Sequence, residues 1–255
     1  MRIISADNIS VVEDKIKNLN EDSLVIFDCD NVLTTVKVGA FNVQNKNFLK
    51  NYLKNKPYGK DEFYDKIRLI LINENTYIVN QRMVDLVANL SKKNIRHIVA
   101  TSYSVRSLKD VPDPIQWRID NLHKMGYFFE KSWLDQNEDI VLKDFGTDHN
   151  PVFRKGVLFC DIFSKSNCIR SFFEHIGWTP KKIIFIDDVL RNLSDVGEFC
   201  DEKKVEYVGI EYLESQYVNS RIPFSDNLGK FQMDRLMNES IWLKDEEVHK
   251  ILSDS

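Results

Sequence analysis

Paired acidic residues follow two apolar segments of this sequence. Asp28 and Asp30 lie two positions apart in VIFDCDNVL, and the neighbours Asp187 and Asp188 end the segment IFIDD. Ligands of open α/β sheets bind at the carboxyl ends of the strands, so two buried strands here would bring all four carboxylates to one site. Such a group of oxygens can bind a divalent cation, transfer protons or act as a nucleophile.

Hydroxyl and amine groups follow two further apolar segments. Thr101 and Ser102 end IVATS, and Lys165 comes shortly after VLFC. Hydroxyl and backbone N–H groups can bind the oxygens of an anion, and a lysine adds a positive charge. The alternatives are a helix N-cap for Thr101 and a solvated Lys165, with Lys155 or Lys143 at the anion site instead. Because a basic residue is disfavoured in the first turn of a helix, a binding role for Lys165 is the preferred interpretation.

The apolar segments have the pattern of buried parallel strands. They are largely apolar on both faces and end in polar residues. The predicted strands are Leu24–Phe27, Ile95–Ala100, Val157–Cys160, Ile183–Ile186 and, with a weaker pattern, Val205–Ile210. Between them, apolar residues recur at helical spacing at Met83, Leu86, Val87 and Leu90 and at Ile169, Phe172, Phe173 and Ile176, before Gly177. This alternation predicts an α/β fold with a doubly wound parallel sheet, a Rossmann-like core with right-handed crossovers.

Two further helical patterns, near residues 48–53 and 63–71, follow the first predicted strand and interrupt this alternation. They predict a small helical cap inserted at residues 35–78. Residues 1–34 and 79–255 then form the core. Its C-terminal part is predicted as a loop and two short helices that pack on the edge of the sheet.

Composition and charge restrict the class of partner. The chain has 255 residues, 43% of them apolar, and a formal net charge of −4. With no long run of either charge, we expect no nucleic-acid partner. No stretch approaches the roughly 20 apolar residues that span a bilayer, and the N-terminus lacks the apolar segment of a signal peptide. We therefore expect no membrane partner and a soluble, cytoplasmic protein, with non-classical secretion left open.

The four cysteines show no spacing typical of a zinc site. Cys29, Cys160, Cys168 and Cys200 form no CxxC pair, and two of them lie within or at the end of apolar segments. Free buried thiols behave as small hydrophobic side chains. We therefore expect structural thiols in a reducing compartment.

The order Asp-x-Asp, Thr, Lys and Asp-Asp at successive strand ends resembles the haloacid dehalogenase (HAD) superfamily, in an uncharacterised bacterial branch. VIFDCDNVL is similar to its first motif at every position in residue type, and the resemblance covers residues 24–192. It implies a Mg²⁺-dependent phosphatase that forms an aspartyl-phosphate. The roles it implies are nucleophile for Asp28, general acid and base for Asp30, phosphate binding for Thr101, Ser102 and Lys165, and metal binding for Asp28, Asp30, Asp187 and Asp188.

The physical requirements of phosphoryl transfer agree with these roles. Negative charge spreads over the equatorial oxygens of the moving group, so catalysis depends on positioning and on charge neutralisation. An unaided carboxylate would repel the phosphate. A Mg²⁺ ion that shares oxygens with Asp28 and Asp187 would offset this repulsion, and Lys165 would add a fixed positive charge.

Other functions match the pattern less well. A dehalogenase needs neither Mg²⁺ nor a second acid at Asp30. A phosphorylation-switched receiver domain has its acid pair first along the chain and its lysine last, whereas Asp187 and Asp188 come last here. A catalytically silent interaction or effector protein on the same fold stays open as the alternative. The substrate is expected to be a phosphate ester of unknown identity, and its selectivity would come from the cap and from an irregular excursion at residues 110–154.

Two polar residues near these motifs have ambiguous roles. Asn192 comes one helical turn after Asp188 and either orients it or faces solvent. Arg106 follows Thr101 by five positions. It could reach a substrate, but the preferred interpretation is an exposed arginine.

Overall fold

The computed structural model describes residues 2–41, 45–54, 56, 58–107, 111–136, 138–219 and 223–253. The chain forms two compact units. The first contains Met1–Thr34 and Ile78–Glu214, and the second contains Thr35–Tyr77 and Ser215–Ser255. The prediction that the C-terminal residues belong to the α/β core is therefore corrected, since residues 215–255 cluster with the segment after the first motif.

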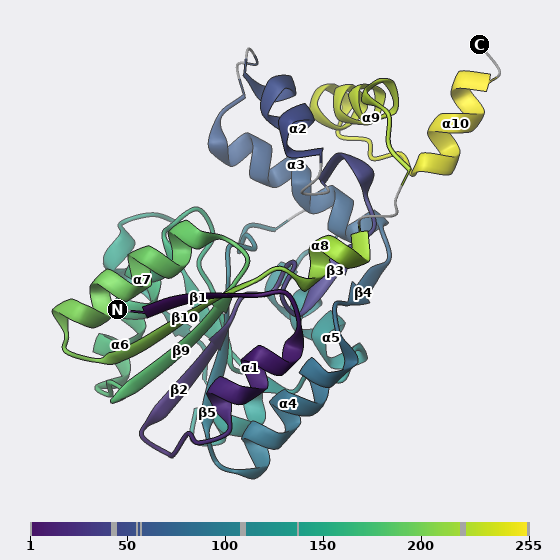
Figure 1. Cartoon of the computed structure of the whole chain (residues 1–255). Coiled ribbons are helices and arrows are strands. Elements are labelled where there is room, and N and C mark those ends of the chain that lie inside the picture. The colour runs from purple at the N-terminus through teal and green to yellow at the C-terminus, as the bar shows by residue number, and fades with distance from the viewer. Residues whose placement is uncertain are drawn as a thin grey trace. The chain divides into compact units, whose positions relative to one another are not determined.

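A mostly parallel sheet forms the centre of the first unit (Figure 1). Within the described residues it has eight strands, in the order β1-β10-β9-β2-β5-β8-β7-β6. Along this order, each neighbouring pair is parallel as far as β8. The last two pairs, β8 with β7 and β7 with β6, are antiparallel. The strands are β1 (Arg2–Ala6), β2 (Ser23–Phe27), β5 (Arg96–Thr101), β6 (Ile140–Val141), β7 (Val152–Arg154), β8 (Val157–Phe159), β9 (Lys182–Asp187) and β10 (Glu206–Tyr212).

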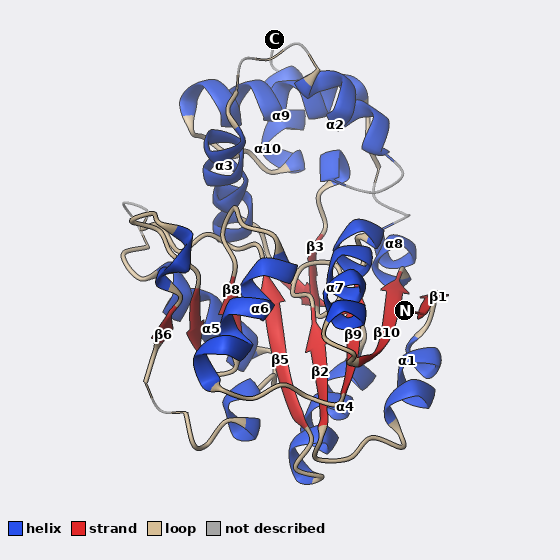
Figure 2. Ribbon diagram, turned by 90° about the vertical axis from the view of Figure 1, so that its left-hand side faces the viewer, coloured by secondary structure: helices blue, strands red, loops and turns tan. Residues whose placement is uncertain are grey.

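Helices cover both faces of this sheet (Figure 2). One face carries α1 (Ile9–Ile16), α4 (Gln81–Lys92) and α5 (Pro114–Lys124), and the other carries α6 (Lys165–Ile176) and α7 (Leu190–Glu202). This division follows from right-handed crossovers, because the chain moves across the sheet in one direction through the first group and in the opposite direction through the second. The prediction of an α/β fold with a parallel sheet is confirmed.

The five predicted strands all exist because their side chains are buried by these helices. Every residue of β2 is buried, and so is every residue of β8. The sequence did not reveal β1, β6 or β7. The strand β1, at the edge of the sheet, has only one buried residue, and β6 and β7 have only two and three residues, so none of these strands carries a long apolar pattern.

The predicted excursion at residues 110–154 is more regular than expected, although position 110 lies outside the described residues. It contains α5, β6 and β7, and the short 3₁₀ helices Phe129–Ser132 and Lys143–Phe145. The strands β6 and β7 extend the sheet beyond β8 as an antiparallel edge. This segment therefore contributes to the core, and the expectation that it also influences selectivity stays a prediction.

The second unit is helical and has its own apolar core. Its helices are α2 (Lys46–Leu53), α3 (Lys60–Asn73), α9 (Asp226–Glu239) and α10 (Asp245–Ser253), with a 3₁₀ turn at Gly39–Phe41. The buried side chains Met233, Leu236 and Met237 of α9 join Ile70 of α3 and Trp242 in this core. The C-terminal helices were expected on the sheet edge, but the apolar face of α9 is buried here instead.

Three shorter elements lie at the points of the sequence where one unit ends and the other begins. The strands β3 (Thr34–Val36) and β4 (Thr76–Ile78) pair with each other, and α8 (Glu214–Asn219) follows β10.

The turn between β7 and β8 gives a stability prediction. Lys155 and Gly156 both have positive φ, 48° and 78°, as a two-residue hairpin turn requires. A Cβ atom at Gly156 would lie 2.6 Å from the backbone carbon of Phe129. We expect Gly156→Ala to lower the free energy of unfolding by about 2–4 kcal/mol, through strain and overpacking together. Urea denaturation followed by tryptophan fluorescence measures this.

Gly146 is the matched control for that substitution. Its φ is also positive, 65°, but no atom lies within 4 Å of the position of an added Cβ. Gly146→Ala should therefore show the backbone strain alone, about 1 kcal/mol. Equal losses for the two variants would contradict the steric argument.

Candidate active site

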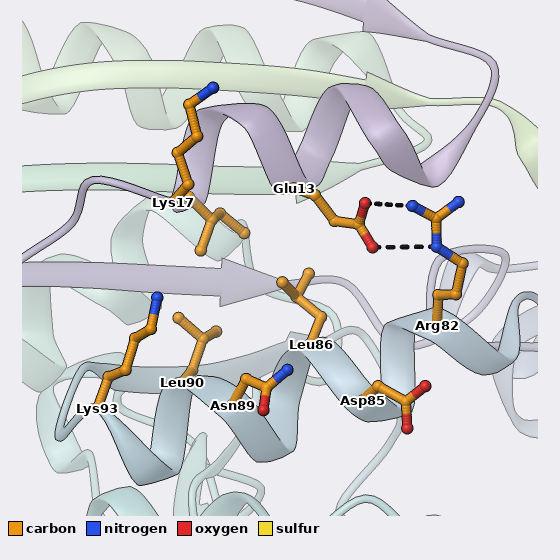
Figure 3. Close-up of a pocket in the computed structure, with 9 residues that line it drawn as sticks. Glu13, Lys17, Arg82, Asp85, Leu86, Asn89, Leu90 and Lys93 are labelled. Carbon is orange, nitrogen blue, oxygen red and sulfur yellow. Dashed lines mark hydrogen bonds and ion pairs between the residues drawn. The ribbon is translucent and has the colours of Figure 1, made fainter.

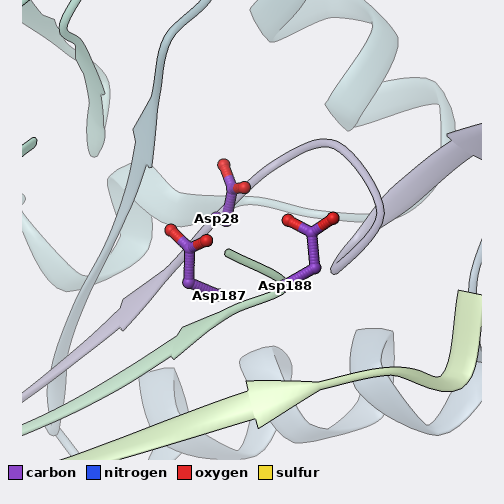
Figure 4. Close-up of side chains that lie close together, drawn as sticks. All are labelled: Asp28, Asp187 and Asp188. Atoms are coloured by element: carbon purple, nitrogen blue, oxygen red, sulfur yellow. The ribbon is translucent and has the colours of Figure 1, made fainter. Parts of the chain in front are cut away.

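Three carboxylates meet at the carboxyl ends of two neighbouring strands. Asp28 follows β2, Asp187 ends β9, and Asp188 is the next residue. The strands are parallel and in register, with Phe27 beside Ile186, so the acids that follow them are brought together. One oxygen from each carboxylate lies within 4.8 Å of the others. In Figure 4 the three carboxyl groups extend to the same side of the strand ends. We refer to these residues as the acid cluster.

Lys165 is the lysine of this cluster. Its Nζ lies 2.6 Å from Oδ1 of Asp28 and 2.7 Å from Oδ2 of Asp187, and its side chain is 3% exposed. Lys155 and Lys143 are both exposed, and the Nζ of Lys155 donates a hydrogen bond to Gln116 instead. Of the three lysines considered from the sequence, the structure brings Lys165 alone against Asp28 and Asp187.

Hydrogen bonds from neighbouring groups orient two of the acids. Asp187 accepts from the backbone N–H of Val189 at 2.8 Å and from Nδ2 of Asn192 at 3.1 Å. Asp188 accepts from Nδ2 of Asn31 at 3.1 Å. Both interpretations of Asn192 are therefore corrected. Its amide orients Asp187 and not Asp188, and its side chain does not simply face solvent.

Burial and mutual repulsion raise the pKa values of two acids in the cluster. Burial raises the pKa of Asp28 well above its usual range, and Asp187 and Asp188 raise it further, against the opposing effect of Lys165. Burial and the charge of Asp187 raise the pKa of Asp188 to about 6, against Lys165 and Asn31. In both cases the cause is a concentration of negative charge away from water.

The cluster fits a hard divalent cation. Mg²⁺ prefers carboxylate oxygens and is often bound through only one or two carboxylates and several waters. When ionised, three carboxylates and the ammonium of Lys165 have a formal charge of −3 + 1 = −2, which one divalent cation would cancel. Asp28, Asp187 and Asp188 are therefore the residues that could hold the ion.

Asp30 does not belong to the acid cluster. Its carboxylate instead forms an ion pair with the guanidinium of Arg118, and 40% of its side chain is exposed. The predicted metal-binding role of Asp30 is therefore corrected. The physical reason is the ion pair itself, because the buried guanidinium of Arg118 draws the carboxylate of Asp30 to the side of α5.

Thr101 and Ser102 lie at the end of β5, beside β2. Thr101 is buried, and its hydroxyl accepts a hydrogen bond from the backbone N–H of Tyr103 at 3.1 Å. Ser102 is half-buried. Residues 102–107 form a loop, so Thr101 is not the N-cap of a helix. The strand order places both residues next to the strand that carries Asp28.

Arg106 is more buried than the sequence suggested. Its side chain is 17% exposed and lies 3.6 Å from the buried carboxylate of Asp161. Ser104 donates a hydrogen bond to the same carboxylate at 3.1 Å. The expectation of an exposed arginine was therefore wrong, because Asp161, which follows β8, provides a buried partner for it.

The strand-end motifs alone do not predict roles for Arg118 or Asn31. Asn31 lies in VIFDCDNVL beside the two acids, but its amide carries no charge, and Arg118 is on α5, about ninety positions from the residues it contacts. An arginine on an amphipathic helix resembles an ordinary surface residue. The signal that was missed is its position: Ile115, Ile119 and Leu122 are buried on the same helix, and Arg118 falls among them at helical spacing.

A separate groove on the first unit lies between α1 and α4 (Figure 3). It has a volume of about 370 Å³ and is lined by both apolar and charged side chains. Arg82 and Glu13 form an exposed ion pair across it, and such pairs contribute little to stability. No residue of the acid cluster lines this groove, so the cluster remains the candidate active site.

The electrostatics of the cluster give a prediction for Asp188→Asn. Because the pKa of Asp188 is raised in the folded state, ionising it costs stability, and that cost is fully present above about pH 6 and shrinks as the pH falls below about 6. Without Mg²⁺ at pH 7.5, we expect the variant to have a free energy of unfolding about 1–2 kcal/mol higher than the parent, with the difference shrinking at lower pH and closing only near the ordinary pKa of an aspartate, about 4. Urea denaturation at several pH values measures this.

Mg²⁺ provides the control for that prediction. A ligand that binds only the folded protein stabilises it. Added Mg²⁺ should raise the unfolding temperature of the parent more than that of Asp188→Asn. A variant that is less stable than the parent at pH 7.5 without Mg²⁺ would contradict the proposed repulsion.

Comparison with other proteins adds a family. Residues 5–249 match a family described as protein of unknown function (DUF2608). An uncharacterised protein of Rickettsia prowazekii is 24% identical, over 98% of this chain and 89% of its own length. An uncharacterised protein of Rickettsia bellii is 25% identical over 76% of this chain and 72% of its own length. No solved structure is significantly similar.

A third relative has a more specific name. A Chlamydia trachomatis protein named as a candidate outer membrane protein is 31% identical over 39% of this chain and 35% of its own length. In this chain, none of the helices in the described ranges is long and apolar enough to span a membrane.

Proposed function

We propose that this chain, which belongs to the DUF2608 family of proteins of unknown function, is a Mg²⁺-dependent phosphatase with an HAD-type core. The observation that carries the proposal is the acid cluster with Lys165 buried against it. A buried carboxylate beside a buried cation at a strand end is suited to attack on an anionic group. The proposed substrate is a phosphate monoester.

In the first step, an oxygen of Asp28 attacks the phosphorus of the ester. The bond between phosphorus and the ester oxygen breaks, and the leaving oxygen takes a proton from the carboxyl group of Asp30. The products are the free alcohol and a phosphoryl group bound to Asp28. Because the nucleophile and the acid lie on one short loop, a single substrate position would serve both.

In the second step, water releases the phosphate. The water oxygen bonds to phosphorus and gives a proton to Asp30, which regenerates the acid. The bond between phosphorus and Asp28 breaks, and inorganic phosphate leaves. The use of a covalent intermediate divides one difficult displacement into two easier ones.

The remaining residues bind charge and fix geometry. Lys165 places its positive charge beside Asp28. This charge lowers the pKa of the Asp28 carboxyl group, against the effect of burial, and keeps the carboxylate available as a nucleophile. Thr101 and Ser102 would hold the phosphate oxygens from the neighbouring strand end. Asp28, Asp187 and Asp188 would hold Mg²⁺, which when bound supplies the charge neutralisation that phosphoryl transfer requires.

We also propose a reducing compartment, in agreement with a cytoplasmic location. The four cysteines of the chain are all free and buried. Burial raises the pKa values of the Cys29 and Cys200 thiols to about 12, which disfavours the reactive thiolate.

The test is the hydrolysis of an aryl phosphate, para-nitrophenyl phosphate, with Mg²⁺ and with a chelator. The proposal expects turnover that needs Mg²⁺ and a phosphorylated protein detectable by mass spectrometry of the quenched reaction. A panel of alkyl, sugar and peptide phosphates would then define the substrate. No Mg²⁺-dependent turnover on any ester would overturn the proposal and favour the alternative, an interaction or effector protein.

A further inference from the structure

Arg118 is a fully buried arginine that contacts the loop carrying the proposed nucleophile. One nitrogen, Nη2, lies 3.1 Å from Sγ of Cys29 and 3.1 Å from Oγ1 of Thr34, and it also forms the ion pair with Asp30. All three partners belong to the six-residue stretch from Cys29 to Thr34. A single side chain of α5 therefore holds both ends of the loop that follows Asp28.

The loop has few other external supports. Its backbone closes on itself, with Asn31 N–H donating to the carbonyl of Thr34 at 2.6 Å and Leu33 N–H to that of Cys29 at 3.0 Å. From outside, the hydroxyl of Tyr127 and the N–H of Val79 both donate to the carbonyl of Leu33, at 3.2 Å and 3.1 Å, and Nδ2 of Asn31 donates to Asp188. None of these bonds reaches the side chain of Asp30, whose exposure would otherwise leave it free to rotate.

Arg118 is buried, but in the part of the chain that the structure describes some of its hydrogen-bond donors have no partner. Among the described residues, its Nε and Nη1 atoms are buried and have no hydrogen-bond partner. Burying a cation without satisfying all its donors is unfavourable, so a buried ion pair of this kind is weak support for a purely stabilising role. The other nearby group is the ring of Tyr103, 5.7 Å from the guanidinium carbon.

We infer that Arg118 is a positioning residue that fixes the carboxyl group of Asp30 relative to Asp28. This inference rests on the proposed function, in which Asp30 moves protons to and from groups bonded at Asp28. A proton donor has to lie within hydrogen-bond distance of the leaving oxygen, and a displacement of about 1 Å can cost roughly a hundredfold in rate. All three contacts come from Nη2, and the rigid planar guanidinium fixes the direction of its N–H bonds, whereas the donors of a lysine ammonium rotate freely.

The consequence is that Arg118 acts through Asp30 alone. Arg118→Met removes the charge and keeps a side chain of similar length, and we expect it to lower kcat by about 10- to 100-fold with little change in KM. The double variant Arg118→Met with Asp30→Asn should be no slower than Asp30→Asn alone. A merely structural arginine would instead give losses that multiply.

The intermediate provides a second readout. Nitrophenolate leaves without needing a proton, so Arg118→Met should still release one equivalent of nitrophenol rapidly from para-nitrophenyl phosphate. Release of phosphate from Asp28 needs Asp30 as a base, so the phosphorylated protein should accumulate, as mass spectrometry would show. An alkyl phosphate, whose leaving oxygen needs a proton, should show no rapid phase.

Two further variants serve as controls. Arg170→Met removes a half-buried arginine that pairs with Glu202 on another helix, away from the acid cluster, and it should leave both phases unchanged. Arg118→Lys keeps the charge and should fall between the parent and Arg118→Met. Thermal unfolding of each variant identifies one that fails to fold, and if Arg118→Met does not fold, the same cycle is run with Arg118→Lys.

The outcomes separate this inference from the function on which it rests. Mg²⁺-dependent turnover by the parent, together with unaffected turnover by folded Arg118→Met, overturns the positioning role alone. Losses that multiply in the double variant overturn it as well. A parent without turnover on any ester overturns both the proposed phosphatase and the role of Arg118.

Discussion

The Asp28→Asn protein is expected to fold normally and to lose Mg²⁺-dependent hydrolysis of phosphate esters by at least about a thousandfold. An amide has the shape of the carboxyl group but cannot attack phosphorus. Folding should not suffer, because burial and the nearby acids already disfavour the charge of Asp28. Initial rates with para-nitrophenyl phosphate, together with thermal unfolding, measure both expectations.

Asp22→Asn is the matched control for that variant. Asp22 is also paired with a lysine, at 2.7 Å from Nζ of Lys181, but 45% of its side chain is exposed. This variant should retain the activity of the parent. If Asp28→Asn keeps more than about a tenth of the parent rate, or still forms the phosphorylated protein, another group is the nucleophile and the proposed mechanism is wrong.

Lys165→Met is expected to have the largest effect on stability and to abolish activity as well. Burial alone would lower the pKa of Lys165, but Asp28 and Asp187 outweigh it, so its pKa is raised and its charge is fully present at neutral pH. Removing one partner of a buried ion pair leaves uncompensated charge and typically costs about 3–5 kcal/mol. We expect a loss of this size in the free energy of unfolding at pH 7.5 without Mg²⁺.

The loss should depend on pH in a defined direction. Without Lys165 the pKa of Asp28 rises further, because the attraction that lowers it is gone. A carboxyl group with a raised pKa in the folded state gains stability from protonation, so the variant should recover as the pH falls from 7.5 to 5. Urea denaturation at several pH values measures this recovery.

Lys181→Met tests whether burial of the ion pair, and not pairing as such, causes the loss of stability. Lys181 lies 2.7 Å from Asp22, the same separation as Lys165 from Asp187, but 81% of its side chain is exposed. Its replacement should leave the unfolding curve unchanged, because water screens an exposed pair. A small effect for Lys165→Met, similar to that of Lys181→Met, would contradict the electrostatic account of the site.

The sequence by itself determined the α/β fold with its parallel strands and the group of residues at the strand ends. Apolar runs such as Leu24–Phe27 and Ile183–Ile186 are strands because continuous apolar segments must be buried on both faces. Asp28 and Asp187 then meet because the carboxyl ends of parallel neighbours lie at the same edge. Lys165 could be placed there by its position after β8.

Tertiary structure alone decided where the C-terminal residues pack. The helix α9 has an amphipathic pattern that would suit the sheet or the other helices equally well. Only the packing of Met233 and Leu236 with Ile70 assigns it to the second unit. Periodicity shows that a face is buried, but not against which partner.

Tertiary structure also decided how Asp30 is used. From the sequence, Asp30 seemed equivalent to Asp28, two positions away on the same side of an extended chain. The ion pair with the buried Arg118 separates its carboxylate from the acid cluster. Contacts between residues about ninety positions apart depend on how the whole sheet and its helices pack, and no local pattern of residue types encodes them.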